Sequence, residues 1–329
     1  MSQPLSDSPR HGLVASHVSV TDRAGHVIVD DVSVHARPGR TLVIVGESGA
    51  GKSMLARTLC ALAPSALSAS GTVSLGGEDY DLATDQGRLK KQRGGGIVWL
   101  PQDPFTSLAP TIRCAKQVTA ARTGRRSERA QRSRALLAEV GLDARVARSY
   151  PHELSGGMRQ RVAIAAALDS EPGVLIADEP TTALDVTVQK QVIDLLNELR
   201  EKLGFAMVFV SHDLALVAKL AHRITVMYAG QVVEQAPTSE LLANPVHEYT
   251  RGLLGAVLSI EAGSKRLHQV RGVVPSPSEF VKGDRFAPRS AHPTVGLETR
   301  PVLKPVPGTT EHSYAITPEL EALLAKEKH

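Results

Sequence analysis

The stretch Thr41–Ser53, TLVIVGESGAGKS, joins an apolar run to a glycine-rich loop and decides the fold. Its last eight residues match the pattern G-x-x-x-x-G-K-[ST], which in nucleotide-binding α/β proteins lies between a buried strand and a helix. The segment Thr41–Val45 is rich in β-branched residues and is typical of such a strand, and a helical pattern runs from Lys52 to about Leu62. The sequence therefore predicts an α/β fold with a phosphate-binding loop.

The residues of this loop suit a polyphosphate. Glycines let successive backbone N–H groups surround phosphate oxygens, and the start of a helix adds a favourable dipole. We expect Lys52 to reach the β- and γ-phosphates and Ser53 to bind Mg²⁺. A chance glycine turn is the alternative, which the strand–loop–helix context disfavours. The predicted nucleotide-binding residues of the loop are Gly46, Glu47, Ser48, Gly49, Ala50, Gly51, Lys52 and Ser53.

A second apolar run ends in an acidic pair, VLIADE at residues 174–179. A phosphate-binding loop needs a carboxylate that holds the metal, usually at the end of a neighbouring strand. Asp178 is predicted to hold Mg²⁺, and Glu179 is predicted to polarise the attacking water as a general base. The alternative is a surface acidic pair that only ends a strand.

A second glycine motif, LSGGMRQ, occupies residues 154–160. A serine and two glycines at a helix start offer a hydroxyl and backbone donors to an anion. One phosphate chain does not need two such sites from one chain, whereas two chains arranged head to tail would each lend one to the other. The residues predicted for this role are Ser155, Gly156 and Gly157.

Together these motifs resemble the ATP-binding subunits of ABC transporters, whose signature sequence is LSGGQ. Here Met158 is the fifth residue and the glutamine follows at Gln160, a form similar to that of the peptide and nickel importers. The resemblance implies a P-loop NTPase core with an antiparallel β subdomain, an inserted helical subdomain and a small C-terminal extension. It also implies ATP and Mg²⁺ as ligands.

The resemblance implies roles for three further residues. Gln102, in LPQDP at 100–104, matches the loop that senses Mg²⁺ and contacts the permease. Asp185 matches the loop that crosses the dimer interface, and His212 matches the histidine that contacts the γ-phosphate. The predicted catalytic residues are thus Glu179, His212, Lys52 and Gln102, and the predicted Mg²⁺ residues are Ser53, Gln102 and Asp178.

One feature of the family is missing. An aromatic side chain usually stacks on adenine, about two dozen residues before the phosphate loop. This sequence has Arg23 and His26 near that position and no aromatic residue. Either residue is a candidate, arginine through a contact of cation–π type.

The expected ATPase domain covers residues 1–245, with the helical subdomain inserted at about 105–168. Six arginines lie in this insert, and three interpretations remain open: a solvated helix face, which the composition favours, attraction to anionic headgroups or acidic permease loops, and an RNA-binding face. These arginines are Arg122, Arg125, Arg126, Arg129, Arg132 and Arg134.

Residues 246–329 form the expected extension, of irregular fold with a short helix at Pro318–Lys328. The segments NPVHEYTRGLL at 244–254 and RFAPR at 285–289 resemble the oligopeptide and dipeptide importers. In many members cysteines of this region bind an iron–sulfur cluster. Asp284 and Ser290 stand where two of them are expected, so we predict no cluster.

Composition agrees with a globular protein of 329 residues: 42% of residues are hydrophobic and the net charge is only +4. Two cysteines are too few for a disulfide framework. No apolar run reaches the roughly 20 residues that a membrane span requires. We expect a peripheral protein on the cytoplasmic face of the inner membrane that does not bind nucleic acid.

The partners implied by the resemblance are two permeases, a second ATPase that is a copy or a paralogue, and an extracytoplasmic solute-binding protein. The implied cargo is peptides, with nickel, opines or another small solute as alternatives. A soluble ATPase that acts on ribosomes or DNA, or a cassette that regulates gene expression or a channel, is the alternative outside transport.

Overall fold

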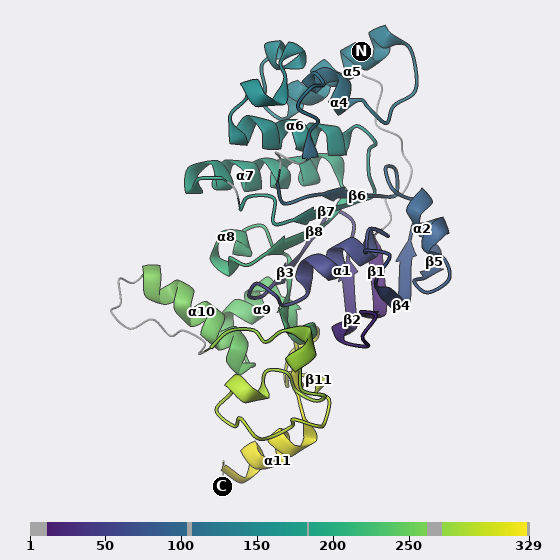
Figure 1. Cartoon of the computed structure of the whole chain (residues 1–329). Coiled ribbons are helices and arrows are strands. Elements are labelled where there is room, and N and C mark those ends of the chain that lie inside the picture. Colours follow the sequence, from purple (N-terminus) through teal and green to yellow (C-terminus); the bar gives the residue numbers. More distant parts are fainter. Residues whose placement is uncertain (1–11, 104–106, 183, 262–271, 328–329) are drawn as a thin grey trace.

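The computed structural model describes residues 12–103, 107–182, 184–261 and 272–327, which form two β-sheets flanked by helices (Figure 1). The smaller sheet is antiparallel, with four strands in the order β2-β1-β4-β5. Its strands are β1 (Leu13–Thr21), β2 (Val27–Ala36), β4 (Ser68–Leu75) and β5 (Glu78–Asp81). The predicted antiparallel subdomain is therefore present.

The larger sheet has eight strands in the order β11-β12-β10-β9-β3-β8-β7-β6. Neighbours from β9 to β6 run parallel, and the pairs among β9, β10, β12 and β11 run antiparallel. The strands are β3 (Thr41–Val45), β6 (Ile97–Leu100), β7 (Val174–Asp178), β8 (Ala206–Ser211), β9 (Arg223–Tyr228), β10 (Gln231–Pro237), β11 (Val302–Pro305) and β12 (Ser313–Ile316). The predicted α/β fold is confirmed.

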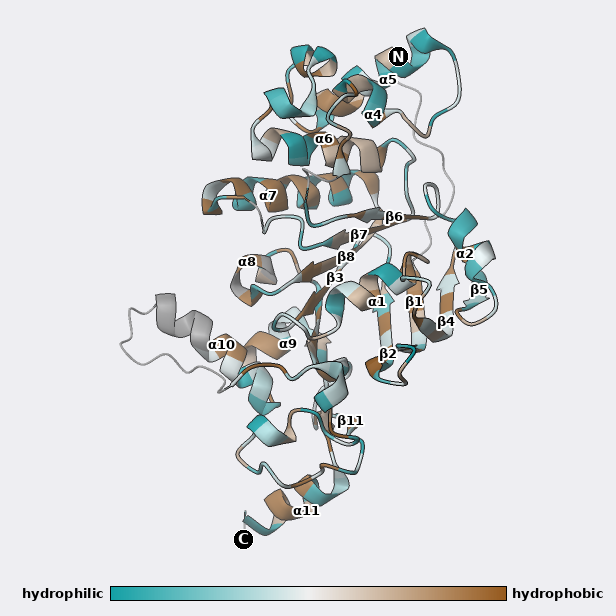
Figure 2. Ribbon diagram, in the orientation of Figure 1, coloured by the Kyte–Doolittle hydropathy of each residue, from teal (hydrophilic) through white to brown (hydrophobic). Residues whose placement is uncertain are grey.

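Every residue of β3, β7 and β8 is buried, because helices or the second sheet cover both faces of the parallel region. Leu42 and Ile44 of β3 join a cluster with the small sheet and with α1 (Lys52–Leu59). Val43 and Val45 join the cluster on the opposite face. This alternation is the two-residue period of a strand, and Figure 2 shows the central strands as the most hydrophobic part of the ribbon.

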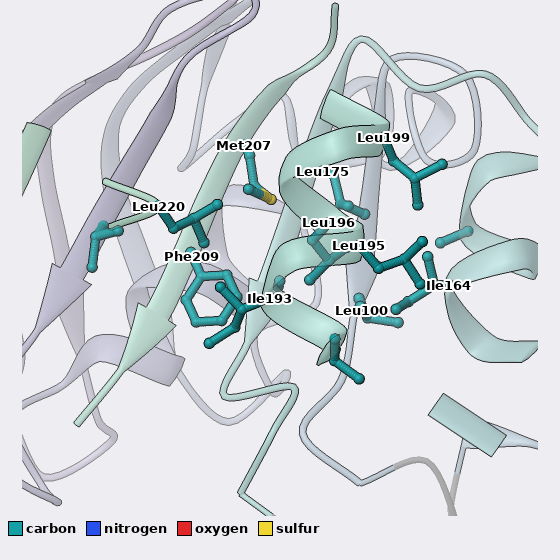
Figure 3. Close-up of a cluster of buried hydrophobic side chains, with 14 of the residues drawn as sticks. Leu100, Ile164, Leu175, Ile193, Leu195, Leu196, Leu199, Met207, Phe209 and Leu220 are labelled. Atoms are coloured by element: carbon teal, nitrogen blue, oxygen red, sulfur yellow. The ribbon is translucent and has the colours of Figure 1, made fainter. Parts of the chain in front are cut away.

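The opposite face is covered by α7 (Val186–Leu203), and α6 (Gly156–Leu168) packs against α7. Figure 3 shows Ile193 and Leu196 of α7 beside Phe209 and Leu175 of the sheet. α7 ends at Gly204, whose φ of 71° is the left-handed conformation that glycine adopts most easily.

A helical block follows β6 along the chain and leads into α6. It contains α4 (Cys114–Val118), α5 (Arg126–Glu139) and two short 3-10 helices, η1 (Ala144–Arg148) and η2 (Pro151–Glu153). Figure 1 shows this block at the end of the molecule opposite to α11 (Pro318–Glu327). The inserted helical region was thus expected from the sequence, and its boundaries at 105–168 remain a prediction.

The arginines of this block do not form one uniform solvated face. Arg122 and Arg132 both bind Asp169, with N–O distances of 3.1 and 3.4 Å, and Arg132 also binds Glu171 at 3.0 Å. Asp169 is buried, so these two arginines fasten the block to the end of α6. Arg125, Arg126 and Arg134 are exposed.

The C-terminal region is less irregular than predicted. β11 and β12 form a hairpin, and β12 adds to the large sheet by pairing Tyr314 with Glu234 of β10. Short strands with a proline and exposed side chains left no clear alternating pattern in the sequence. The remaining elements are α2 (Gln86–Lys91), α8 (Leu214–Ala218), α9 (Thr238–Ala243), α10 (Glu248–Glu261), η3 (Pro277–Glu279) and η4 (Ala287–Arg289). Among the described residues, no helix combines the length and apolar composition that crossing a membrane requires.

Candidate nucleotide site

The glycine-rich loop joins β3 to α1 and is tightly enclosed. A Cβ atom on Gly46 would lie 2.1 Å from the carbonyl oxygen of Met227, so no larger residue fits there without a shift of the backbone. Gly51 precedes α1 with φ of 87°, a conformation that side chains disfavour. A Cβ atom on Gly51 would also lie 3.1 Å from the carbonyl oxygen of Ile28. Close packing against neighbouring backbone therefore explains why glycine stands at these two positions of the loop.

Lys52 is the first residue of α1, and its side chain is only 4% exposed. Its Nζ donates hydrogen bonds to the carbonyl oxygens of Gly46 at 2.8 Å and Glu47 at 3.0 Å, and it lies 3.8 Å from Glu179 Oε1. Burial lowers the pKa of Lys52, and the carboxylates of Glu179 and Asp178 oppose that change. A buried ammonium in a glycine-rich loop at the start of a helix is suited to an anionic ligand.

Ser53 and Asp178 meet across the site. The Ser53 hydroxyl donates to Asp178 Oδ1 at 2.7 Å, and Asp178 is the last residue of β7. Burial raises the pKa of Asp178, whereas the hydrogen bond from Ser53 lowers it. A hydroxyl beside one carboxylate fits Mg²⁺, which is usually held by one or two carboxylates, water and substrate phosphates. Within the described ranges, no group of three or more His, Cys, Asp or Glu side chains is arranged to hold a metal.

Glu179 is the centre of a polar cluster. Its Oε2 atom lies 3.1 Å from His212 Nδ1 and accepts hydrogen bonds from Thr182 Oγ1 at 3.0 Å and from Gln102 Nε2 at 3.4 Å. Its backbone N–H donates to the Val210 carbonyl at the end of β8. The structure thus brings together Gln102, Glu179 and His212, which lie far apart in the sequence. Thr182 was missed, although its hydroxyl, three residues after an acidic residue, offered a weak signal.

The second glycine motif lies elsewhere. Ser155 caps α6, its hydroxyl oxygen accepting a weak bond from the Met158 N–H at 3.4 Å. A Cβ atom on Gly157 would lie 2.6 Å from Val188 Cγ1, and one on Gly156 would lie 3.3 Å from Leu184. Both glycines therefore allow α6 to pack closely against the start of α7.

Asp185 lies beside this motif, where its Oδ1 accepts from the Val188 N–H at 3.0 Å and caps α7. In the part of the chain that the structure describes, no hydrogen bond or ion pair joins Ser155, Gly156 or Gly157 to the phosphate loop. α6 belongs to the core cluster on one face of the sheet and α1 to the cluster on the other. One chain therefore does not bring its two glycine motifs together.

Of the two adenine candidates, His26 is held in a turn. Its Nδ1 lies 2.9 Å from Asp22 Oδ2, and Asp22 also accepts from the backbone N–H groups of Ala24 and His26. Arg23 is in the same turn. The turn leads into β2, where Ile28 borders Gly51. Arg23 and His26 therefore lie on the turn before β2, and β2 borders the phosphate loop at Gly51. The contact of either residue with adenine stays a prediction.

Comparison with known proteins agrees with this geometry. The ABC transporter family matches residues 29–182, and the family described as "Oligopeptide/dipeptide transporter, C-terminal region" matches residues 233–294. The oligopeptide transport ATP-binding protein AppD of Bacillus subtilis is 41% identical over 79% of this chain and 82% of the relative. The dipeptide transport ATP-binding protein DppD of Lactococcus lactis is 42% identical over 83% of this chain and 81% of the relative.

Solved structures agree as well. A dimeric ATP-binding cassette in a post-hydrolysis state with ADP and Pi has a TM-score of 0.60 and 28% identity, covering 69% of this chain and 98% of that one. The ABC transporter component cbiO1 of Clostridium perfringens has a TM-score of 0.62 and 25% identity, covering 76% and 96%. The chain therefore belongs to the ABC transporter family as an ATP-hydrolysing subunit, in the branch that carries the oligopeptide/dipeptide transporter C-terminal region.

Proposed function

We propose that this subunit drives the import of di- and oligopeptides through partner permeases, with residues 46–53 as its ATP site. The observation that carries the site assignment is the convergence of Gln102, Thr182 and His212 on Glu179, whose carboxylate lies 3.8 Å from Lys52 Nζ. The names of the relatives, which are oligopeptide and dipeptide transport proteins, support the cargo.

In this proposal the phosphate loop binds and orients the substrate ATP. Backbone N–H groups of residues 48–53 surround the β- and γ-phosphates, and Lys52 exchanges a loop carbonyl for a phosphate oxygen. Ser53, Asp178 and Gln102 would hold Mg²⁺, which when bound would neutralise charge on the phosphates. Phosphoryl transfer of this kind depends mainly on positioning and on charge neutralisation.

Glu179 is proposed to accept a proton from the attacking water. Its left-handed backbone conformation, φ 46°, and its bond to the Val210 carbonyl fix its position at the carboxyl ends of β7 and β8. His212 is 53% exposed and would turn from Glu179 toward the γ-phosphate. Gln102 would report the presence of Mg²⁺ to the permease.

The second glycine motif is proposed to serve the nucleotide of a partner ATPase. The separation of α6 and α1 on opposite faces of the sheet supports this arrangement, because Ser155, Gly156 and Gly157 are left for another chain. Asp185 lies beside them and would cross the same interface. Each ATP is then held by the phosphate loop of one subunit and the serine–glycine motif of the other.

The proposed location is the cytoplasmic face of the inner membrane, where two permeases hold the pair of ATPases. An extracytoplasmic binding protein would select the peptide, so we assign no cargo specificity to residues of this chain. We infer that this subunit does not bind nucleic acid. We also infer that it holds no iron–sulfur cluster, since Asp284 and Ser290 replace two of the expected cysteines.

Affinity purification of the tagged Glu179→Gln variant from detergent-solubilised native membranes with MgATP tests this proposal. We expect two multi-spanning permeases and a second ATPase, identified by mass spectrometry, and peptide binding by the associated solute-binding protein. The tagged Lys52→Ala variant is the control for complexes that depend on ATP. Recovery of ribosomal or DNA-repair proteins without a permease would overturn the transport assignment.

A further inference from the structure

Glu47, the second residue of the phosphate loop, is held by a residue of the C-terminal extension 242 positions away. Arg289 Nη1 donates to Glu47 Oε2 at 2.9 Å, and Arg289 Nη2 donates to Glu47 Oε1 at 3.2 Å. Two parallel N–H···O bonds of this kind fix the relative orientation of the two groups, as well as their distance. A lysine in the same place could not form this fork.

Arg289 is itself rigidly placed. Its side chain is only 8% exposed, at the end of η4. The guanidinium lies over the ring of Tyr228, 5.3 Å from the ring centroid, and Nη2 also donates to the Gly272 carbonyl at 3.1 Å. Because the arginine is fixed on the extension, it can fix Glu47 in turn.

A second residue of the extension binds the backbone of Glu47. The Glu47 N–H donates to Tyr249 Oη at 2.8 Å, and Tyr249 belongs to α10. Tyr249 is fully buried and packs edge-on against Tyr228, with ring centroids 5.0 Å apart. Burial raises the pKa of Tyr249, so the phenol stays neutral near pH 7.

Glu47 is therefore held at three points. Its side chain binds Arg289, its N–H binds Tyr249, and its carbonyl oxygen accepts from Lys52 at 3.0 Å. The peptide group between Gly46 and Glu47 is the first of the loop, so its orientation sets the course of the backbone into the phosphate cradle. It also supplies a carbonyl that holds the Lys52 ammonium.

The extension also supports the other side of the loop. Arg285 Nη1 donates to the Ala229 carbonyl at 2.6 Å, and the next residue, Gly230, donates its N–H to the Ala50 carbonyl of the loop at 3.0 Å. A Cβ atom on Gly230 would lie 2.1 Å from the Ile28 carbonyl, so this contact leaves no room for another residue. The loop is thus clamped between two contacts that originate in residues 246–329.

We propose that Arg289 and Tyr249 are positioning residues that preorganise the phosphate loop, so that nucleotide affinity depends on the C-terminal extension. The inference rests on the proposed role of residues 46–53 as the phosphate site. Glu47 needs no side-chain contact with the nucleotide for this function. Its carboxylate is the link through which the extension acts on the loop.

The experiment compares Arg289→Gln, Arg289→Lys, Glu47→Gln, Tyr249→Phe and the double variant Glu47→Gln/Arg289→Gln in the full chain. The dissociation constant for Mg²⁺ with a ribose-labelled fluorescent ADP is measured by titration, and the Tm is measured without nucleotide. Arg37→Gln is the matched control, because Arg37, the residue after β2, also joins the core to the extension, at Glu311, without contacting the loop.

We expect Arg289→Gln and Glu47→Gln each to weaken MgADP binding about tenfold, as is usual for coupling between two sites. The double variant should be no weaker than either single variant, because both remove the same contact. Arg289→Lys should restore only part of the affinity, Tyr249→Phe should weaken binding, and Arg37→Gln should bind like the parent. In steady-state hydrolysis the KM should rise more than kcat falls.

Parent-like binding by both Arg289→Gln and Glu47→Gln would overturn the inference, and so would equal losses in Arg289→Gln and Arg37→Gln. If Arg289→Gln does not fold, Glu47→Gln and Arg289→Lys decide the matter. Lys52→Ala separates this inference from the site assignment. Parent-like nucleotide binding by Lys52→Ala contradicts the site, whereas loss in Lys52→Ala alone contradicts only the positioning role.

Discussion

His212 Nδ1 lies 3.1 Å from Oε2 of Glu179, and this contact joins the residue after β8 to the residue after β7. Glu179 reaches it from a backbone conformation with φ of 46°, which for a residue other than glycine stores about 1–3 kcal/mol of strain. Strain kept in this way is typical of functional sites. The pair therefore joins Glu179, the proposed general base, to the loop that begins at His212.

Replacing Glu179 by Gln should abolish most of the hydrolysis and preserve binding. The amide has a similar shape and no basic oxygen, so the rate should fall by about 100-fold or more, the range of a general base. Turnover with saturating MgATP and binding of labelled ADP are the two measurements. Hydrolysis at the parent rate would show that another group accepts the proton.

Replacing Asp178 by Asn should raise the Mg²⁺ concentration needed for activity. The variant keeps the size of the side chain and the contact to the Ser53 hydroxyl but loses the negative charge that attracts the ion. A titration of ATPase activity with Mg²⁺ should show a midpoint shifted upward by about tenfold or more. Asp194→Asn, an exposed residue of α7, is the control. An unchanged midpoint would contradict the assignment.

Replacing Gly157 by Ala should destabilise the contact between α6 and α7. The added methyl group would lie 2.6 Å from Val188 Cγ1, and overpacking of this type usually costs about 1–3 kcal/mol. Urea unfolding gives the loss, and Val188→Ala in the same chain should recover part of it by making room. A second variant as unstable as the first would mean that the clash is not with Val188.

Buried His247 should make the protein less stable in mild acid. Burial and the nearby Arg251 lower the pKa of His247 from 6.5 to about 3, and its Nδ1 accepts the Tyr249 N–H at 3.2 Å. Between these two pH values the unfolded chain binds a proton that the folded chain does not. Stability therefore falls as pH drops below about 6.5, by up to about 1.4 kcal/mol per unit from this group.

Urea unfolding of the parent and of His247→Gln at pH 7.5 and pH 5.5 measures this contribution. The parent should lose more free energy of unfolding than the variant between the two pH values. Because the other histidines are the same in both proteins, the difference isolates His247. Equal losses would show that His247 does not titrate in this way.

The sequence predicted the parts of the site that depend on local backbone chemistry. Strand, glycine loop and helix are adjacent in the chain, so the loop at Gly46–Ser53 was visible in one pattern. The roles of Gln102 and His212 depended on family resemblance, since a lone glutamine or histidine in a loop carries no pattern. The structure places both beside Glu179, and their roles stay predictions.

Contacts between distant residues could not be predicted in the same way. Arg289 and Glu47 are 242 residues apart, and neither the spacing nor the composition of their surroundings indicates a pair. The hairpin of β11 and β12 was missed because each strand is only four residues long, and most side chains of β11 are exposed. Both features depend on how the chain returns to the sheet.

The buried carboxylate of Glu234 joins the C-terminal extension to the large sheet. It accepts hydrogen bonds from the N–H groups of Val246 and His247 and lies 2.6 Å from His312 Nε2. It therefore holds β10 to the start of the extension and to the residue before β12. At this edge of the large sheet the outermost strand is consequently β11, four residues long with Lys304 and Pro305, instead of the seven-residue, mostly buried β10. Short edges with lysine and proline resist pairing with other chains, so the extension also acts as a guard against aggregation.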